Sequence, residues 1–308
     1  MITLYWLWRL GVWLVGLAPR RLSWTIAGTM GNSLYYLMPL RRRVAEENMA
    51  HVLGTSTNAP NVRRAARLSF RNFARLLRDV MLYANMSDVE IAKRVTIHEG
   101  ENMASALALG KGAIIVTAHF GNMDLASALI AKQFAPIALV SETLRPPQLM
   151  KFYTDMRGKH NVNMNPYAQA PRRIIEALKR NELTAFLIDF GVTHHLDMVT
   201  VPVNFFGAET NFPAGPAQLA LLTGAPIVVG YTRVADDEKI EVHFTPPIIV
   251  QRTSDKRALF QATMQEIAHR MENFIQPTPE QWYIFRPMWH IEPAKERQIQ
   301  KASLSADR

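Results

Sequence analysis

Cysteine is absent from the 308-residue chain, which excludes disulfides, thiolate metal sites and a cysteine nucleophile. The sequence also lacks the G-x-S-x-G turn of serine hydrolases, the P-loop, the dinucleotide-binding G-x-G-x-x-G and the zinc-binding H-E-x-x-H. Acidic residues are few, with 26 Asp and Glu against 35 Lys and Arg, so the net charge is +9. Such a surface attracts polyanions, although it can also serve solubility alone.

The first forty residues differ in composition from the rest of the chain. Residues 4–17 are apolar apart from Arg9, and residues 22–40 contain no charged side chain. Arginines flank both stretches, at positions 20, 21 and 41–43. A signal peptide has a single apolar core before its cleavage site, and the first stretch is short for a bilayer span. We therefore expect a retained interfacial helix or shallow hairpin, the alternative being an amphipathic helix docked on the protein's own core.

Aromatic residues support a membrane surface as the partner of this segment. Trp and Tyr settle at the level of lipid headgroups, and the segment contains Trp6, Trp8, Trp13, Trp24, Tyr35 and Tyr36. The neighbouring arginines are suited to anionic lipid. We expect a membrane surface that carries anionic lipid.

Apolar runs and helical patterns alternate from residue 113 onward. Strand-like runs occupy residues 113–117, 136–140, 183–188, 226–231 and 240–244. Helical patterns lie between them, at residues 124–132, 147–159, 171–180 and 213–222. This alternation predicts an α/β fold with a mixed central sheet flanked by helices. The chain then divides into a membrane-anchoring helical segment at 1–43, an α/β domain at 44–292 and a polar tail at 293–308.

Residues 60–83 form a long helical pattern rich in arginine. Basic and aromatic residues together can indicate nucleic acid, but at helical spacing they are more typical of an amphipathic helix with a solvated face. We therefore expect no nucleic-acid partner.

The stretch that carries chemistry is residues 118–124 (AHFGNMD), which follows the run at 113–117. His119 is expected at the carboxyl end of a strand, where open α/β sheets bind their ligands. Asp124 falls near the first turn of the next helix, from which its carboxylate can reach one ring nitrogen and fix the tautomer. The other nitrogen would then be available as a base. A lone His–Asp pair is also common as a structural feature, so the context decides.

Further blocks supply that context. Residues 110–124 (GKGAIIVTAHFGNMD) and 203–216 (VNFFGAETNFPAGP) are the strongest, and residues 41–48, 187–189 and 279–289 accompany them in order. Together they resemble the lipid A biosynthesis acyltransferase family, which includes lauroyl and myristoyl transferases and phosphatidylinositol mannoside acyltransferases. This family belongs to the wider glycerolipid acyltransferase group with an H-x-x-x-x-D/E motif. The resemblance extends from the apolar N-terminus to about Trp289.

The resemblance implies direct transfer of a fatty acyl chain from acyl-CoA or acyl carrier protein (acyl-ACP) to a hydroxyl of a glycolipid. It implies no covalent enzyme intermediate and no cofactor, which agrees with the missing cysteine and serine elbow. His119 would act as general base, oriented by Asp124. The implied location is the cytoplasmic face of a bacterial inner membrane, where the protein would be monotopic or peripheral.

Several residues are assigned to substrate binding. Main-chain amides around Phe206 and Gly207, or at the helix start near Pro213 and Gly215, are candidate donors to the tetrahedral oxyanion. Both glycines can equally serve turn formation. Asp189 follows a strand and could orient an arginine or the acceptor.

Arginine forks suit bidentate capture of phosphate, and Arg145 and Arg157 lie between the two main blocks, although arginines are more often solvated helix charges. No metal site is expected, because the adjacent His194 and His195 lack a third ligand at suitable spacing.

The acceptor stays open at this point. The lipid A branch usually has Glu at the position of Asp124, so this residue resembles the phosphatidylinositol mannoside branch, whereas residues 119–122 (HFGN) are usual in the lipid A branch. Alternatives are a lysophospholipid acyltransferase, a hydrolase that uses His119 on water, and a non-catalytic lipid-binding membrane protein of the same fold. The presence of both His119 and Asp124 favours an enzyme.

Overall fold

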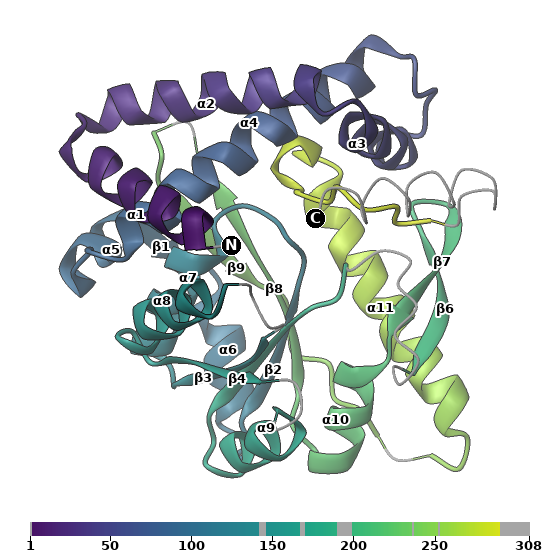
Figure 1. Cartoon of the computed structure of the whole chain (residues 1–308). Coiled ribbons are helices and arrows are strands. Elements are labelled where there is room, and N and C mark those ends of the chain that lie inside the picture. The colour runs from purple at the N-terminus through teal and green to yellow at the C-terminus, as the bar shows by residue number, and fades with distance from the viewer. Residues whose placement is uncertain are drawn as a thin grey trace.

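A sheet of seven strands forms the centre of the protein (Figure 1). The computed structural model describes residues 2–141, 146–166, 170–189, 199–235, 237–251 and 253–289. The strand order is β1-β9-β8-β2-β5-β3-β4. The strands are β1 (Val95–Ile97), β2 (Ala113–Thr117), β3 (Ile137–Ser141), β4 (Val162–Pro166), β5 (Leu183–Leu187), β8 (Ile227–Val234) and β9 (Ile240–Phe244). β8 and β9 pair antiparallel and the other neighbours run parallel, which confirms the predicted mixed sheet.

Helices cover both faces of this sheet because the central strands are apolar on both sides. In β2, Ile114 and Val116 belong to one core cluster and Ala113 and Ile115 to the other. The second cluster includes side chains of α6 (Gly100–Leu107), α7 (Met123–Gln133) and α8 (Pro147–Gly158). The first includes side chains of α9 (Ala170–Lys179), α10 (Gly215–Thr223) and α11 (Lys256–Ile275).

The N-terminal part of the chain forms four helices, which lie above and beside the sheet in Figure 1 and contribute side chains to both core clusters. They are α1 (Ile2–Leu17), α2 (Arg20–Leu37), α3 (Pro39–Leu53) and α4 (Pro60–Tyr83). α2 packs closely across α4 because Gly31 lacks a side chain: a Cβ there would lie 2.5 Å from the carbonyl oxygen of Phe70. Among the helices of the described residues, none is both long and apolar enough to cross a membrane. Membrane contact of residues 1–43 stays a prediction, as does the division into segments.

Some elements were not predicted from the sequence. β6 (Thr200–Phe205) and β7 (Ala208–Pro213) form a two-stranded hairpin apart from the main sheet. Helix α5 (Asp88–Arg94) and the long helix α11 also lie outside the predicted pattern. Pro213 ends β7, so α10 begins two residues later than expected, at Gly215. The predicted tail at 293–308 lies outside the described residues.

Candidate active site

His119 and Asp189 form the centre of the site. Nδ1 of His119 lies 2.8 Å from Oδ1 of Asp189, and the main-chain N–H of His119 donates to Oδ2 at 2.8 Å. The two residues meet because β2 and β5 are parallel neighbours with Thr117 opposite Leu187, so the chain just beyond each strand lies at the same sheet edge. Asp189 therefore holds the imidazole by ring and backbone together.

This geometry differs from the expected pairing of His119 with Asp124. Asp124 is the second residue of α7. Its Oδ1 accepts a hydrogen bond from Nε of Arg157 at 2.8 Å and lies 2.8 Å from Nη2 of the same guanidinium. The contact to Nδ1 of His119 belongs to Asp189, because the carboxyl end of the adjacent strand reaches the ring. Asp189 was expected to orient an arginine or the acceptor, and here it orients the histidine.

The carboxylate of Asp189 is fully buried and held in its charged form. Burial alone would raise its pKa, but the charge of His119, hydrogen bonds from His119 and a hydrogen bond from Trp282 outweigh burial and lower the pKa of Asp189. The indole N–H of Trp282 donates to Oδ2 at 2.8 Å. A charged carboxylate on Nδ1 favours the tautomer with the proton there, which makes Nε2 the proton-accepting nitrogen.

The turn that carries His119 is fixed from several directions. The N–H of Tyr283 donates to the carbonyl of His119 at 2.8 Å, and the hydroxyl of Thr232 donates to the carbonyl of Phe120 at 2.8 Å. Gly121 has a φ of +64°, and a Cβ there would meet the carbonyl oxygen of Thr232 at 1.9 Å. The turn therefore requires glycine at this position.

In the Asp124–Arg157 pair, Asp124 is buried and the side chain of Arg157 is 21% exposed. Burial opposes the charge of Arg157, but the charge of Asp124 and its hydrogen bond outweigh this and raise the pKa of Arg157. The guanidinium also lies over the ring of Tyr153, 5.5 Å from its centroid. Tyr153 in turn packs on Trp8 of α1, with ring centroids 5.7 Å apart. Since Asp124 already engages this guanidinium, capture of phosphate by Arg157 stays a prediction without geometric support.

A cavity of about 950 Å³ adjoins the site. Its lining is mainly apolar and is supplied by α7, β3, α9 and α10, with the side chains of Ile130, Leu139, Ile174, Leu219 and Leu222. Asp124 and Arg157 are among its polar lining residues. Thr117, Ile188 and Thr232 also line it, so the cavity extends to the strand ends next to His119. Its size lies at the upper end of the usual range for ligand pockets, about 300–1,000 Å³.

The predicted oxyanion donors separate in space. Phe206 and Gly207 form the loop of the β6–β7 hairpin, and both have positive φ. The N–H of Phe206 donates to Oε1 of Glu272, so this amide is engaged within the protein. The role of the Gly207 amide stays a prediction. Pro213 and Gly215, by contrast, both line the cavity. The start of α10 thus stays a candidate for this role.

One predicted site residue and the histidine pair considered for a metal fall outside the structure's description. Arg145 lies outside the described residues, as do His194 and His195. Trp282, whose indole N–H contacts Asp189, was not among the predicted site residues. Its signal was its place in the block at 279–289, where a tryptophan N–H needs a buried acceptor.

Comparison of the sequence with known proteins identifies the family of the chain. A family model described as bacterial lipid A biosynthesis acyltransferase matches residues 1–291. A phosphatidylinositol mannoside acyltransferase of Mycolicibacterium smegmatis is 27% identical over 252 residues, which cover 81% of this chain and 80% of the relative. One from Mycobacterium tuberculosis is 26% identical over 264 residues, covering 83% of this chain and 80% of the relative. The chain belongs to the bacterial lipid A biosynthesis acyltransferase family.

Proposed function

We propose that this acyltransferase moves a fatty acyl chain from a thioester, acyl-CoA or acyl-ACP, to a hydroxyl of a glycolipid, with His119 as general base. The observation that carries the proposal is the 2.8 Å contact between Nδ1 of His119 and the buried carboxylate of Asp189. A carboxylate that fixes Nδ1 leaves Nε2 as the nitrogen that takes the acceptor's proton.

In this mechanism the acceptor hydroxyl gives its proton to Nε2 of His119 as its oxygen attacks the thioester carbonyl. The tetrahedral intermediate then collapses, the carbon–sulfur bond breaks, and the thiolate leaves and takes up the proton from the imidazolium. Asp189 stabilises the imidazolium between these steps because its lowered pKa keeps it charged. Because the chain contains no cysteine, an acyl-thioester intermediate on the enzyme is excluded.

The cavity is the proposed site for the acyl chain. A hydrocarbon chain requires an apolar channel that ends at the reacting carbonyl, and this cavity is lined by aliphatic side chains and reaches Ile188, directly before Asp189. The first turn of α10, with Gly215 in the lining, is the proposed oxyanion donor, since the amides at the start of a helix favour negative charge.

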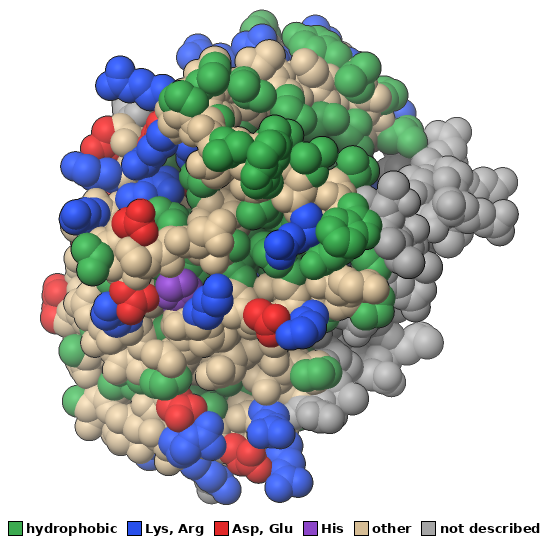
Figure 2. All heavy atoms as spheres, turned by 60° about the vertical axis from the view of Figure 1, so that its left-hand side comes forward, with side chains coloured by type: hydrophobic (Ala, Val, Ile, Leu, Met, Phe, Trp, Pro, Cys, Tyr) green, Lys and Arg blue, Asp and Glu red, His purple; other side chains and the backbone are tan. Residues whose placement is uncertain are grey.

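The N-terminal helices are the proposed membrane-contact surface. Large apolar side chains of α1 at helical spacing are exposed: Trp6, Leu7, Leu10, Trp13, Leu14 and Leu17. α2 continues this surface with Leu22, Ile26, Met30, Leu34 and Leu37. Figure 2 shows apolar side chains gathered over the upper part of the face on which these helices lie. So large an exposed apolar area, with exposed arginines at positions 9, 20 and 21, is suited to an anionic lipid surface.

The acceptor and location are proposed from the relatives. Both relatives are named phosphatidylinositol mannoside acyltransferases, which favours a phosphatidylinositol mannoside-like acceptor over a lipid A-like one. Because soluble acyl thioesters are available in the cytoplasm, the proposed location is the cytoplasmic face of the inner membrane.

A transfer assay tests the proposal. The full chain is incubated with labelled palmitoyl-CoA or palmitoyl-ACP and vesicles that contain phosphatidylinositol mannosides, lipid A precursors or lysophospholipid. The expected product is a labelled glycolipid ester that His119→Ala abolishes. Release of free fatty acid without a lipid product, or label on lysophospholipid alone, would overturn it.

A further inference from the structure

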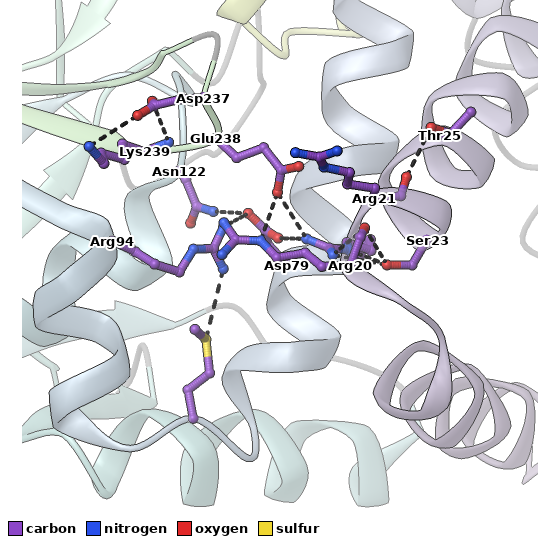
Figure 3. A network of polar contacts seen from close by, with 12 residues as sticks. Arg20, Arg21, Ser23, Thr25, Asp79, Arg94, Asn122, Asp237, Glu238 and Lys239 are labelled. Atoms are coloured by element: carbon purple, nitrogen blue, oxygen red, sulfur yellow. Dashed lines mark hydrogen bonds and ion pairs between the residues drawn. The ribbon is translucent and has the colours of Figure 1, made fainter.

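A buried cluster of charges contacts Asn122, which follows His119 by three residues (Figure 3). Asp79 of α4 is its centre and is 1% exposed. Its Oδ1 accepts from Nη1 of Arg78 at 2.6 Å, and its Oδ2 accepts from Nη2 of Arg94 at 3.0 Å. Buried charges are tolerated only when paired, so Asp79 holds two elements, α4 and α5, against each other.

Asp79 makes one further contact, which reaches the proposed site. Its Oδ2 accepts from the side-chain amide of Asn122 at 2.9 Å. Asn122 is 1% exposed and stands in the same turn as His119. The amide oxygen of Asn122 accepts from the N–H of Leu125 at 3.3 Å, which caps helix α7. The side chain of Asn122 therefore makes two contacts: its oxygen caps α7, and its NH2 group binds the turn to Asp79.

The other side of the cluster reaches helix α2. Nη2 of Arg78 donates to the carbonyl of Arg20 at 3.0 Å and to the hydroxyl of Ser23 at 2.9 Å. Ser23 is buried in the contact between α2 and α4. A continuous chain of hydrogen bonds thus runs from α2, which bears part of the exposed apolar surface, through Arg78 and Asp79 to the turn.

We propose that Asp79 is a positioning residue for the reaction: through Asn122 it fixes the turn that carries His119, and through Arg78 it ties that turn to the seating of α2. This rests on the proposed function of His119. On the sheet side the conformation of the turn is fixed by Gly121 and by the hydrogen bonds from Tyr283 and Thr232. On the α4 side it is fixed by the contact between Asn122 and Asp79.

The sharpest variant is Asn122→Ser. Serine caps helices about as well as asparagine, so α7 keeps its start, but the donor to Asp79 is lost. The full chain in detergent micelles is assayed with palmitoyl-CoA and phosphatidylinositol mannosides. We expect kcat to fall about tenfold to a hundredfold with little change in the donor KM, because misplacing a reacting group by about 1 Å costs that much. Ser23→Ala should act in the same direction and less strongly.

A second readout separates positioning from general damage. In ¹⁵N-histidine-labelled protein, the Nδ1 proton resonance of His119 is identified by its absence in His119→Ala, and Asn122→Ser should shift it. This resonance reports the geometry of the turn whether or not His119 is the base. Retained activity in His119→Ala would therefore contradict the proposed function of His119, but not the positioning of the turn by Asp79.

Two control variants complete the design. Glu238 ion-pairs with Arg20 and Arg78 at the outer edge of the cluster, without a contact to Asn122, so Glu238→Gln should keep kcat. Met103→Ala removes a fully buried side chain from α6 and lowers stability away from the turn. Wild-type kcat in Asn122→Ser, or a loss of kcat with an unshifted His119 resonance, overturns the proposal.

Discussion

The carboxylate of Asp189 lies 2.8 Å from Nδ1 of His119, although the two residues are 70 positions apart in the chain. Asp124 is far closer in sequence, yet its carboxylate pairs with Arg157. The sheet explains the difference, because it places the carboxyl ends of β2 and β5 side by side. The acidic residue of the H-x-x-x-x-D spacing, Asp124, therefore lies in the cavity wall with Arg157, and the carboxylate on the ring of His119 comes from Asp189, outside that spacing.

The role of Asp189 gives the first prediction. Asp189→Asn should lower kcat by about 10²–10⁴-fold, because the neutral amide neither fixes the tautomer of His119 nor stabilises its imidazolium. Steady-state kinetics at saturating donor measure the effect. His119→Ala should cost about as much and the double variant little more, since the residues act as a unit. A variant that keeps more than about a tenth of the wild-type kcat would contradict the assignment.

The second prediction concerns pH. The pKa of Asp189 in the folded protein is lowered from its ordinary value of 3.8. A carboxyl group with a lowered folded-state pKa binds its proton more readily when unfolded, so its contribution to stability is present above about pH 4 and is lost as pH falls through the folded pKa. The difference in unfolding free energy between wild type and Asp189→Asn should therefore shrink below about pH 4. Urea titrations of both proteins at pH 7 and below pH 4 measure it. An unchanged difference would show that Asp189 is not held in its charged form.

Five strands of the sheet were predictable because they are apolar runs bounded by turn residues, whereas the edge strands β1 and β4 were not predicted because they are short or largely polar. β2 and β9 lie at their predicted positions, and β3, β5 and β8 shift by no more than a few residues. Helix α11 was not predicted, although its sequence carries the signal: Met264, Ile267, Ala268, Met271, Phe274 and Ile275 are buried and recur at helical spacing. The β6–β7 hairpin was missed because its loop, Phe206-Gly207, needs positive φ at a phenylalanine, which few sequence patterns indicate.

The site was predictable only in part. His119 could be placed at a strand end because the strand and the helix after it are both clear in the sequence. The partner of His119 could not be identified, because the order of strands in a sheet leaves no local signal: β2 pairs with β5, and β3 lies on the far side of β5. The same holds for Arg157, whose ion pair with Asp124 joins residues 33 positions apart.

The third prediction concerns the Asp124–Arg157 pair. Asp124→Asn leaves the partly buried guanidinium of Arg157 without its charged partner and should lower the unfolding free energy by about 1.5–3 kcal/mol. Arg157→Met should do the same from the other side. The double variant should cost less than the sum, since no buried charge is left alone. Chemical denaturation of the four proteins gives the coupling. Additive losses would show that the two residues act independently.

The fourth prediction addresses the exposed surface of α1. Leu10 and Trp13 are 50% and 60% exposed, and each is proposed to enter the lipid headgroup region. Leu10→Glu and Trp13→Glu should each weaken binding to anionic vesicles roughly tenfold or more, since burying one such side chain contributes about 1.5–3 kcal/mol. Vesicle sedimentation measures it. Leu109→Glu is the matched control, because Leu109 is equally exposed but lies beyond α6. Equal loss in the control would argue against a surface formed by α1.

The last prediction tests the cavity as the acyl site. Leu219 of α10 lines it and is partly buried, so the larger side chain of Leu219→Trp should fill part of the volume that the acyl chain would occupy. Each methylene that no longer fits loses about 0.8 kcal/mol, so two excluded methylenes should lower kcat/KM for the long chain about tenfold or more. The preference among acyl-CoA donors should therefore shift toward shorter chains, while the rate with the best short donor is kept. Competition between donors of graded chain length measures this ratio directly. Leu109→Trp adds the same bulk outside the cavity lining and should leave the preference unchanged. An unaltered chain-length profile in Leu219→Trp would mean that the acyl chain binds elsewhere.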